Sequence, residues 1–291
     1  MKIGLVTDST CDLSPDLLKK YQITAVPLNI HLEGEVYQDR VDLQAEEFYE
    51  RLPSVSKLPS TSQPSVGQFL ECYNNLKDKY DRLISIHLSG NLSGTVESAT
   101  LASRQIEGIE VEVIDSYSAS YGLGFQVLKA AMLIESGEED IKEIKKQVEK
   151  VKNNTSVYFT VDDLKYLEKG GRIGKAQSLL GSVLKFNPIL KLDHTDGQVT
   201  SYKKIRGETR TINEMADLFR SNFSSDNIWL SLLRAKEDDR FLKFSEKLKK
   251  DISDREDSIT LFKSIISPVL GAHTGPSLYG GIICSGDFLK K

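Results

Sequence analysis

Short apolar runs alternate with amphipathic segments along the first half of the chain. Four of these runs have the length and the branched residues of β-strands: residues 2–7, 23–30, 82–88 and 109–114. The segments between them space their apolar residues as helices do, and one puts several on a single face: Val66, Phe69, Leu70, Tyr73 and Leu76. Strands that alternate with helices form parallel sheets covered by helices on both faces. The pattern therefore predicts an N-terminal α/β/α domain with a parallel sheet, residues 1–153.

The second half of the chain has a mixed pattern. Apolar runs at 188–192 and 199–205 flank a polar segment that ends in Asp196-Gly197, which predicts an antiparallel hairpin. Further apolar runs are separated by helical patterns: residues 156–161, 228–233, 258–265 and 281–284. A helix rich in small residues is predicted over 175–184. Together these elements predict a second α/β domain with a mixed sheet, residues 154–291.

A loop rich in hydroxyl groups precedes the helix that carries Phe69. This loop contains Thr61, Ser62 and Ser65, and Pro64 is expected to be the first helical residue because its missing N–H is not needed there. The free N–H groups of that first turn, beside the hydroxyls, would suit a phosphate or a carboxylate. The simpler alternative is that Ser62 only caps the helix.

A second loop of the same kind follows the third predicted strand. It includes Ser93, Gly94 and Thr95, while Asp8 and Asp115 end two other strands. Because the carboxyl ends of parallel strands meet at one edge of the sheet, these loops predict a ligand site there. As alternatives, Ser93 would cap the next helix, and the two carboxylates would accept hydrogen bonds from loop N–H groups instead of acting as catalytic acids.

The second half of the chain supplies cations. Arg172 follows two glycines, Arg206 ends the predicted hairpin, and His273 lies near the C-terminus. A cleft with hydroxyl groups on one wall and cations on the other fits an anionic head group. Each cation also has a simpler interpretation: Arg172 as an exposed turn residue, Arg206 as a solvated strand end, and His273 as a structural histidine.

Composition argues against several classes of function. The 291 residues carry a net charge of −4 with both signs mixed, which does not suit a nucleic-acid partner. No apolar run approaches the ~18 residues of a membrane helix, and no signal peptide is predicted. The three cysteines and four histidines are scattered along the chain, so no disulfide framework and no metal site are expected. We expect a cytoplasmic protein with reduced thiols.

Two segments of the chain resemble known enzyme motifs but do not match them. Residues 90–94 place their serine one position too late for a nucleophile elbow. Residues 170–175 resemble a phosphate-binding loop, but the glycine spacing is short by one and Ala176 replaces the hydroxyl that binds magnesium. We therefore predict no catalytic residue and no cofactor.

Several segments, taken in order along the chain, carry a resemblance to a known family. They are Thr7-Asp8-Ser9, Thr61-Ser62-Gln63-Pro64-Ser65, Ser93-Gly94-Thr95, Asp115-Ser116, Leu167-Glu168-Lys169-Gly170-Gly171-Arg172-Ile173 and His273-Thr274-Gly275-Pro276. With these motifs the chain resembles the DegV family, and within it the fatty-acid-binding subunit of bacterial fatty acid kinase. The motifs span nearly the whole chain, so the resemblance is specific. One departure is Ser277, where family members often have glycine.

The resemblance implies a bacterial two-domain α/β protein that holds one long-chain fatty acid, with the tail in an apolar tunnel. The residues that would bind the carboxylate are Thr61, Ser93, Arg172 and His273. The residues that would support their loops are Ser62, Gly94, Thr95, Asp8 and Asp115. A separate ATP-dependent kinase subunit would convert the carboxylate to an acyl phosphate for phospholipid synthesis, and an acyltransferase would use that product. Arg206 would contact the partner or the phosphate.

Two other functions stay open from the residues alone. One is a stand-alone phosphotransferase or hydrolase that acts on an anionic substrate, with Ser93 or His273 as the catalytic group. The other is a sensor of phosphate or a similar anion without an acyl tunnel. Turnover of ATP or of an ester by the isolated chain would favour the first, and calorimetry with phosphate against oleate would separate the second from a fatty-acid carrier.

Overall fold

The first half of the chain contains a four-stranded parallel sheet, as the sequence predicts. A computed structural model describes residues 1–181, 186–223 and 227–290. The sheet has the order β2-β1-β6-β7. Its strands are β1 (Ile3–Asp8), β2 (Ile23–Val26), β6 (Arg82–His87) and β7 (Glu110–Asp115). The helices of this half are α1 (Pro15–Lys20), α2 (Ala45–Arg51), α3 (Val66–Leu76), α4 (Thr95–Gln105), α5 (Tyr121–Glu135) and α6 (Ile141–Asn153).

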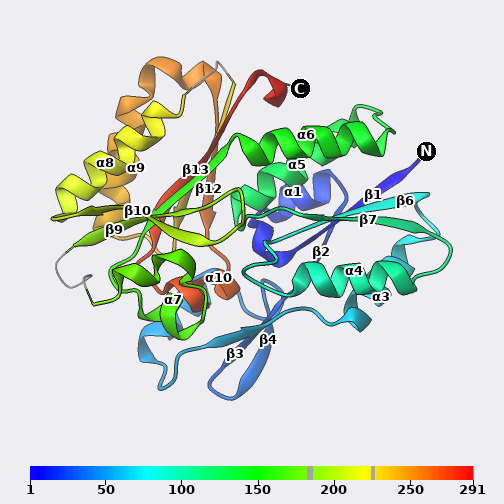
Figure 1. Cartoon of the computed structure of the whole chain (residues 1–291), viewed down its shortest axis with the longest axis horizontal. Coiled ribbons are helices and arrows are strands. Elements are labelled where there is room, and N and C mark those ends of the chain that lie inside the picture. Colours follow the sequence, from blue (N-terminus) through cyan, green and yellow to red (C-terminus); the bar gives the residue numbers. More distant parts are fainter. Residues whose placement is uncertain (182–185, 224–226, 291) are drawn as a thin grey trace.

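Side chains of this sheet alternate between two cores. Val6 belongs to the core cluster of Phe69 in α3 and Ala99 in α4. Its neighbour Leu5 belongs to a different cluster, which includes Phe125 in α5. Successive residues of a strand point to opposite faces, so helices cover both faces of the sheet. Figure 1 shows α5 and α6 above the sheet and α3 and α4 below it.

The second half forms a six-stranded mixed sheet in the order β10-β9-β8-β13-β11-β12, again as predicted. Its strands are β8 (Thr155–Thr160), β9 (Asn187–Leu192), β10 (Val199–Ile205), β11 (Ile228–Arg234), β12 (Ile259–Ile265) and β13 (Tyr279–Ser285). Of the described pairs, β11 and β12 run parallel and the others antiparallel. The helices are α7 (Lys165–Lys169), α8 (Glu208–Ser221), α9 (Asp239–Asp251) and α10 (Pro268–Thr274).

The two faces of the mixed sheet have different partners. Tyr158 packs with Phe219 of α8 in a core of the second half, where α9 also contributes. The neighbouring residues Val157 and Phe159 belong to the cluster that extends into the first half. One core therefore spans both halves of the chain. The boundary that we place at residue 153 falls between α6 and β8, and the division into domains stays a prediction.

A third, small antiparallel sheet was not predicted. It has the order β4-β3-β5 and consists of β3 (Asn29–Leu32), β4 (Glu35–Gln38) and β5 (Ser60–Ser62). The prediction of a single strand over 23–30 is wrong. Pro27 has no N–H for the hydrogen bonds of a sheet, and the chain leaves the parallel sheet at this residue. The hydroxyl-rich loop is in part a strand, with Thr61 paired to Ile30.

Helix α3 begins later than predicted. Ser65 is its N-cap, and a capping box links Ser65 to Gln68: Gln68 N–H donates to Ser65 Oγ at 3.2 Å, and Ser65 N–H donates to Gln68 Oε1 at 2.9 Å. Pro64 therefore lies before the helix and is not its first residue. The alternative role of Ser62 as the cap is also wrong, since its hydroxyl pairs with Asn29 in the small sheet (3.4 Å).

Two expectations for the second half have different outcomes. The hairpin is confirmed, since β9 and β10 pair antiparallel and Gly197 has a left-handed φ of 66° in the turn. The prediction of a small-residue helix at 175–184 is wrong over its first part, because Gly174–Leu179 form a short 3₁₀-helix. Its first residue, Gly174, has a left-handed φ of 51°, and Gly181 beyond its end has a left-handed φ of 80°. The last residues of the predicted helix, 182–184, lie outside the described residues. Within the described ranges, no helix is long and apolar enough to cross a membrane.

Candidate functional site

A cavity of about 420 Å³ lies where the two halves of the chain meet. Most of its wall is apolar and comes from both halves, including Leu28, Leu88, Ala119, Val157, Phe159 and Leu233. A smaller group of polar residues completes it: Thr61, Ser62, Gln63, Ser93, Ser120, Arg172, His273 and Thr274. The volume is typical of pockets for small molecules. The cavity therefore suits a mainly apolar ligand with one polar part.

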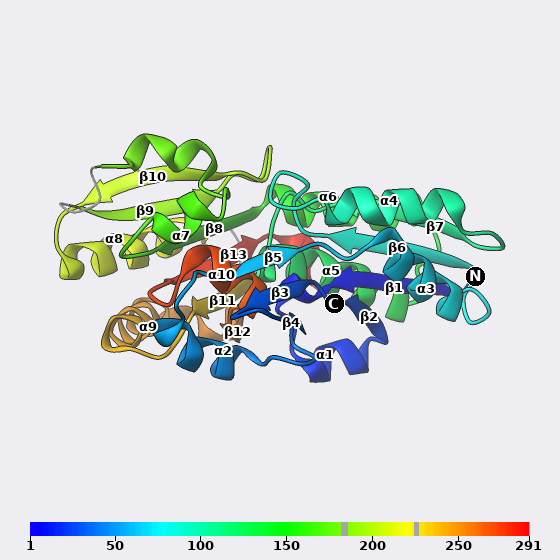
Figure 2. The ribbon, with the colours of Figure 1, turned by 90° about the horizontal axis from the view of Figure 1, so that it is seen from below.

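The four residues that the sequence indicates for an anionic head group all line this cavity. Thr61 comes from β5, Ser93 from the loop after β6, Arg172 from the turn after α7, and His273 from α10. Figure 2 shows β5 running beside α10, with α7 close to them. Four segments that are far apart in the sequence thus meet at one site. Their role in binding stays a prediction.

Thr61 and His273 form a close pair. Thr61 Oγ1 lies 2.7 Å from His273 Nε2. Burial, and after it the positive charge of Arg172, lowers the pKa of His273 to about 4, so the ring is neutral near pH 7. The second ring nitrogen, Nδ1, is buried and has no hydrogen-bond partner among the described residues. The proton of the neutral ring is therefore best placed on Nε2, where Thr61 accepts it.

Gly170 lets the ring of His273 reach this position. A Cβ atom at residue 170 would lie 2.2 Å from His273 Nδ1 and 2.8 Å from the backbone oxygen of Tyr166. Any side chain here would displace the ring or the backbone. The glycine of the Gly170-Gly171-Arg172 turn is therefore part of the site, although it binds nothing itself.

Arg172 joins the two halves of the chain at the cavity wall. Its Nε donates to the carbonyl oxygen of Leu92 at 2.9 Å, and its Nη1 donates to that of Gly170 at 2.7 Å. No other hydrogen bond of this side chain is found within the described residues, which leaves further N–H groups for an anion. The alternative of a merely exposed turn residue does not fit these bonds.

Ser93 does not cap the helix that follows it. The N-cap of α4 is Gly94, and no side chain caps the first turn of this helix. Ser93 Oγ instead lies 2.9 Å from Thr95 Oγ1. Ser93 lines the cavity while Thr95 is buried behind it. The hydroxyl of Thr95 thus orients that of Ser93, as expected of a supporting residue.

Gln63 was missed by the sequence analysis. It lines the cavity, and its Nε2 donates to Ser98 Oγ of α4 at 3.0 Å. Its amide lies over Gly94, where a Cβ atom would be 2.3 Å from Gln63 Oε1. Gln63 therefore connects the segment of Thr61 with the loop of Ser93. The signal for Gln63 in the sequence is an amide side chain directly after a cluster of hydroxyl residues.

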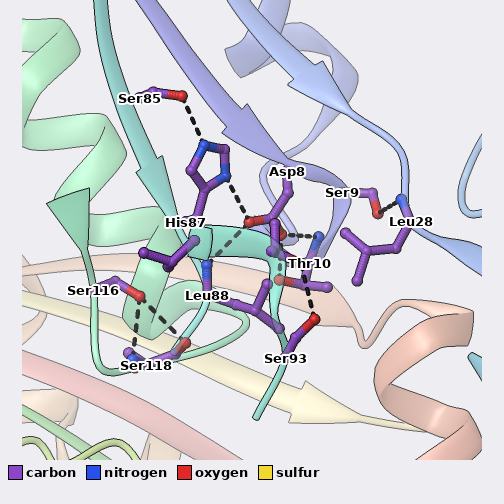
Figure 3. Close-up of polar contacts among 12 residues, drawn as sticks. Asp8, Ser9, Thr10, Leu28, Ser85, His87, Leu88, Ser93, Ser116 and Ser118 are labelled. Carbon is purple, nitrogen blue, oxygen red and sulfur yellow. Dashed lines mark hydrogen bonds and ion pairs between the residues drawn. The ribbon is translucent and has the colours of Figure 1, made fainter. Parts of the chain in front are cut away.

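The carboxylates of Asp8 and Asp115 accept N–H groups of the backbone and are not among the residues that line the cavity. Figure 3 shows Asp8 between Thr10, His87 and the backbone of Leu88. Asp8 is completely buried and accepts the N–H of Leu88 at 3.0 Å. Asp115 accepts N–H groups from Gly90 at 3.1 Å and Tyr117 at 2.8 Å. Burial raises the pKa of Asp115, and these bonds oppose that effect.

Arg206 lies apart from the cavity. It follows the last residue of β10, and its guanidinium lies over the ring of Phe186 at 5.9 Å from the centroid. Its neighbours in a shallow surface depression include Lys203, Lys204 and Arg210. The carboxylates of Glu214 and Asp217 line the same depression, and Glu214 pairs with Lys203 at 2.6 Å. The structure thus places Arg206 among these charges and not with the four residues of the cavity. Its role in contacting a partner stays a prediction.

Fold and cavity together define an α/β protein with an apolar pocket between a parallel and a mixed sheet. The chain belongs to the DegV family, whose model, described as an uncharacterised protein family, matches residues 2–285.

Three relatives match along nearly their whole length. A DegV domain-containing protein of Halalkalibacterium halodurans is 37% identical over 281 residues, which cover 96% of this chain and 97% of the relative. Among solved structures, a DegV family protein from Thermus thermophilus, described for its fatty acid binding, is 33% identical with a TM-score of 0.89, covering 98% of this chain and 100% of that one. DegV from Bacillus subtilis, described as a fatty acid binding protein, has the same identity and TM-score, covering 98% and 99%.

Proposed function

We propose that the chain binds one long-chain fatty acid in the cavity, with the acyl tail against the apolar wall. The observation that carries this proposal is the lining itself, which is mainly apolar and includes Thr61, Ser93, Arg172 and His273 among its polar side chains. Burying an acyl tail contributes about 0.8 kcal/mol per CH₂, so a tail of 16 carbons gives roughly ten kcal/mol before ordering costs. The descriptions of the relatives from Thermus thermophilus and Bacillus subtilis support the same ligand.

The carboxylate would be held by donors at the polar end. A carboxylate that leaves water needs hydrogen bonds or a counter-charge to offset its desolvation. The hydroxyl of Thr61 can supply one, because the favoured tautomer of His273 donates to its oxygen at 2.7 Å and leaves the hydroxyl proton free. Ser93 and the guanidinium of Arg172 line the same cavity and complete the set.

The finer proposal is that a separate ATP-dependent kinase subunit phosphorylates this carboxylate to an acyl phosphate for phospholipid synthesis. The chain would present its ligand and would not catalyse the transfer, because its sequence lacks a complete phosphate-binding loop. The cations around Arg206 form the proposed contact for the partner or its phosphate.

The hydrolase alternative takes Ser93 or His273 as the catalytic group. Of these two, His273 lies 2.7 Å from a hydroxyl, that of Thr61, which is the distance of a nucleophile and its base. In a catalytic triad a carboxylate orients the other ring nitrogen. Here that nitrogen is buried, with no partner among the described residues. The pair therefore lacks the third group, and the binding function is the better supported one.

Native mass spectrometry of the purified protein, followed by solvent extraction of the ligand, tests the first proposal. We expect one fatty acid per chain, or uptake of one added oleate or palmitate. A chain that carries no lipid and takes up neither acid would contradict the binding function. Incubating the loaded chain with ATP and a bacterial fatty acid kinase subunit tests the second proposal, and ester hydrolysis by the chain alone would favour the alternative.

A further inference from the structure

A chain of buried hydrogen bonds runs behind the cavity. Tyr73 Oη lies 3.0 Å from Ser85 Oγ, and Ser85 Oγ lies 2.7 Å from His87 Nε2. On the other side of the ring, His87 Nδ1 lies 3.1 Å from Asp8 Oδ2. All four side chains are completely buried. Figure 3 shows the part of this chain from Ser85 to Asp8.

The acceptors at one end fix the direction of the bond between His87 and Asp8. Asp8 Oδ1 accepts the N–H and the hydroxyl of Thr10, at 3.0 and 2.5 Å, and Asp8 Oδ2 accepts the N–H of Leu88. Both oxygens of Asp8 thus act as acceptors, so His87 donates Nδ1–H to it. Nε2, on the other side of the ring, lies against the hydroxyl of Ser85, which in turn lies against that of Tyr73.

The groups Asp8, His87 and Ser85 have the order of a hydrolase triad, but they do not form a catalytic site. The hydroxyl of Ser85 has no exposed surface and is held between Tyr73 and His87. Ser85 does not line the cavity. A substrate cannot reach this hydroxyl, so the network has a different use.

The network ends at the loop that carries Ser93. The N–H of Leu88 donates to Asp8 Oδ2 at 3.0 Å, and the side chain of Leu88 lines the cavity. From Leu88 the chain enters residues 89–95. On the opposite side, the ring of His87 meets the ring of Phe69 in α3 edge-on, with centroids 5.0 Å apart. His87 therefore contacts α3 directly and the loop of Ser93 through Asp8.

We propose that His87 is a positioning residue for the head-group end of the cavity. By donating Nδ1–H to Asp8, it fixes the carboxylate oxygen that holds the first N–H of the loop, and with it the position of Ser93. This inference rests on the proposed function, because retention of a fatty acid is one of its readouts. It requires a donor at the Nδ1 position, and not merely a ring of this size.

The test compares three variants with wild type. His87→Phe keeps a ring beside Phe69 but has no donor, and His87→Asn places an amide N–H near the Nδ1 position. Ile283→Val is the matched control, since it removes one methyl group from the separate core of the second half. Amide hydrogen exchange of residues 88–95 and the dissociation rate of cis-parinaric acid, a fluorescent fatty acid, are measured where all variants are folded.

In His87→Phe, we expect the amide hydrogens of residues 88–95 to exchange at least tenfold faster than in the control. We also expect this variant to release the fluorescent fatty acid at least fivefold faster. His87→Asn should restore both values to within about threefold of wild type, and ¹⁵N spectra of wild type should show the proton of the His87 ring on Nδ1. Exchange and release in His87→Phe equal to those of the control would overturn the proposal, as would a ring with its proton on Nε2.

If His87→Phe does not fold, the tautomer of the wild-type ring and the behaviour of His87→Asn still test whether a donor at Nδ1 is required. If wild type takes up no probe, the proposed fatty-acid function fails, while the tautomer and the exchange pattern still test the role of His87.

Discussion

The direction of one hydrogen bond decides what Thr61 offers to a ligand. With the pKa of His273 lowered to about 4, mainly by burial, the ring is neutral near pH 7. Its buried Nδ1 has no partner among the described residues, which favours the tautomer whose Nε2–H donates a hydrogen bond to Thr61 Oγ1. The hydroxyl of Thr61 keeps its own proton for the cavity. A histidine that resembles a general base therefore serves as a donor that orients a hydroxyl.

Thr61→Val removes this hydroxyl and keeps the shape of the side chain. We expect the retention of a fatty acid to weaken by about 1–3 kcal/mol, because the buried carboxylate loses a donor. Thr61→Ser keeps the hydroxyl and should retain most of the affinity. Titration with a fluorescent fatty acid gives the dissociation constants. Equal constants for the valine and serine variants would show that Thr61 does not bond to the carboxylate.

Asp39 is completely buried against the first turn of α10. Its Oδ1 accepts the N–H of Val269 at 3.4 Å, while its Oδ2 has no partner among the described residues. Burial raises the pKa of Asp39 to about 7, against an ordinary 3.8. Folding therefore favours the protonated form. The stability that this form contributes is complete below pH ~4 and is lost as the pH rises through about 7.

Asp39→Asn resembles the protonated form at every pH. We expect the free energy of unfolding of the variant, relative to wild type, to rise between pH 4 and pH 7 by on the order of 2–4 kcal/mol. Urea unfolding at several pH values measures the difference. His273→Gln is a control of opposite sign: the pKa of His273 is lowered, so wild type loses stability as the pH falls from 6.5 to about 4. A pH-independent difference for Asp39→Asn would contradict the prediction.

At the scale of elements, the periodicity of apolar residues predicts the strands of the two large sheets but not those of the small sheet. Strands such as β1 and β11 are long apolar runs, and their helices have a clear face. In contrast, β5 comprises Ser60–Ser62, whose pairing with β3 depends on tertiary contacts. Loop composition was enough to find Thr61 and Ser93. His87 escaped notice because a single histidine at the end of an apolar strand has no local signal for its buried partner Asp8, 79 residues away.

The start of α3 was predictable from a motif that was overlooked. Ser65-Val66-Gly67-Gln68 has the spacing of a capping box, and the structure forms both of its bonds. Ser65→Ala should lower the free energy of unfolding by about 1 kcal/mol. Ser62→Ala is the matched control and should have a smaller effect, since Ser62 caps no helix. Urea unfolding of both variants decides, and a larger loss for Ser62→Ala would contradict the assignment of the cap.

The whole molecule has one core cluster that spans both halves, and the cavity lies between them. A ligand there should stabilise the chain as a unit. At a free fatty acid concentration of 100 times its dissociation constant, the gain is about 2.7 kcal/mol, or roughly 5–10 °C in melting temperature. Calorimetry of delipidated and loaded protein measures this shift. Two separate transitions, of which one does not respond to the ligand, would argue against a binding site that both halves share.

A substitution of Arg206 can test the proposed presentation to a kinase separately from the proposed binding. It lies outside the cavity, among Lys203, Lys204 and Arg210 on the surface. We therefore expect Arg206→Ala to retain the fatty acid and the melting shift of wild type, but to slow phosphorylation by the kinase subunit at least tenfold, since a cation for the partner or its phosphate is lost. Arg255→Ala, in the 3₁₀-helix Ser253–Ser258, controls for loss of a surface arginine. If Arg206→Ala loses fatty acid and phosphorylation in parallel, Arg206 acts on the head group instead, because a residue that serves only the partner cannot change binding in its absence.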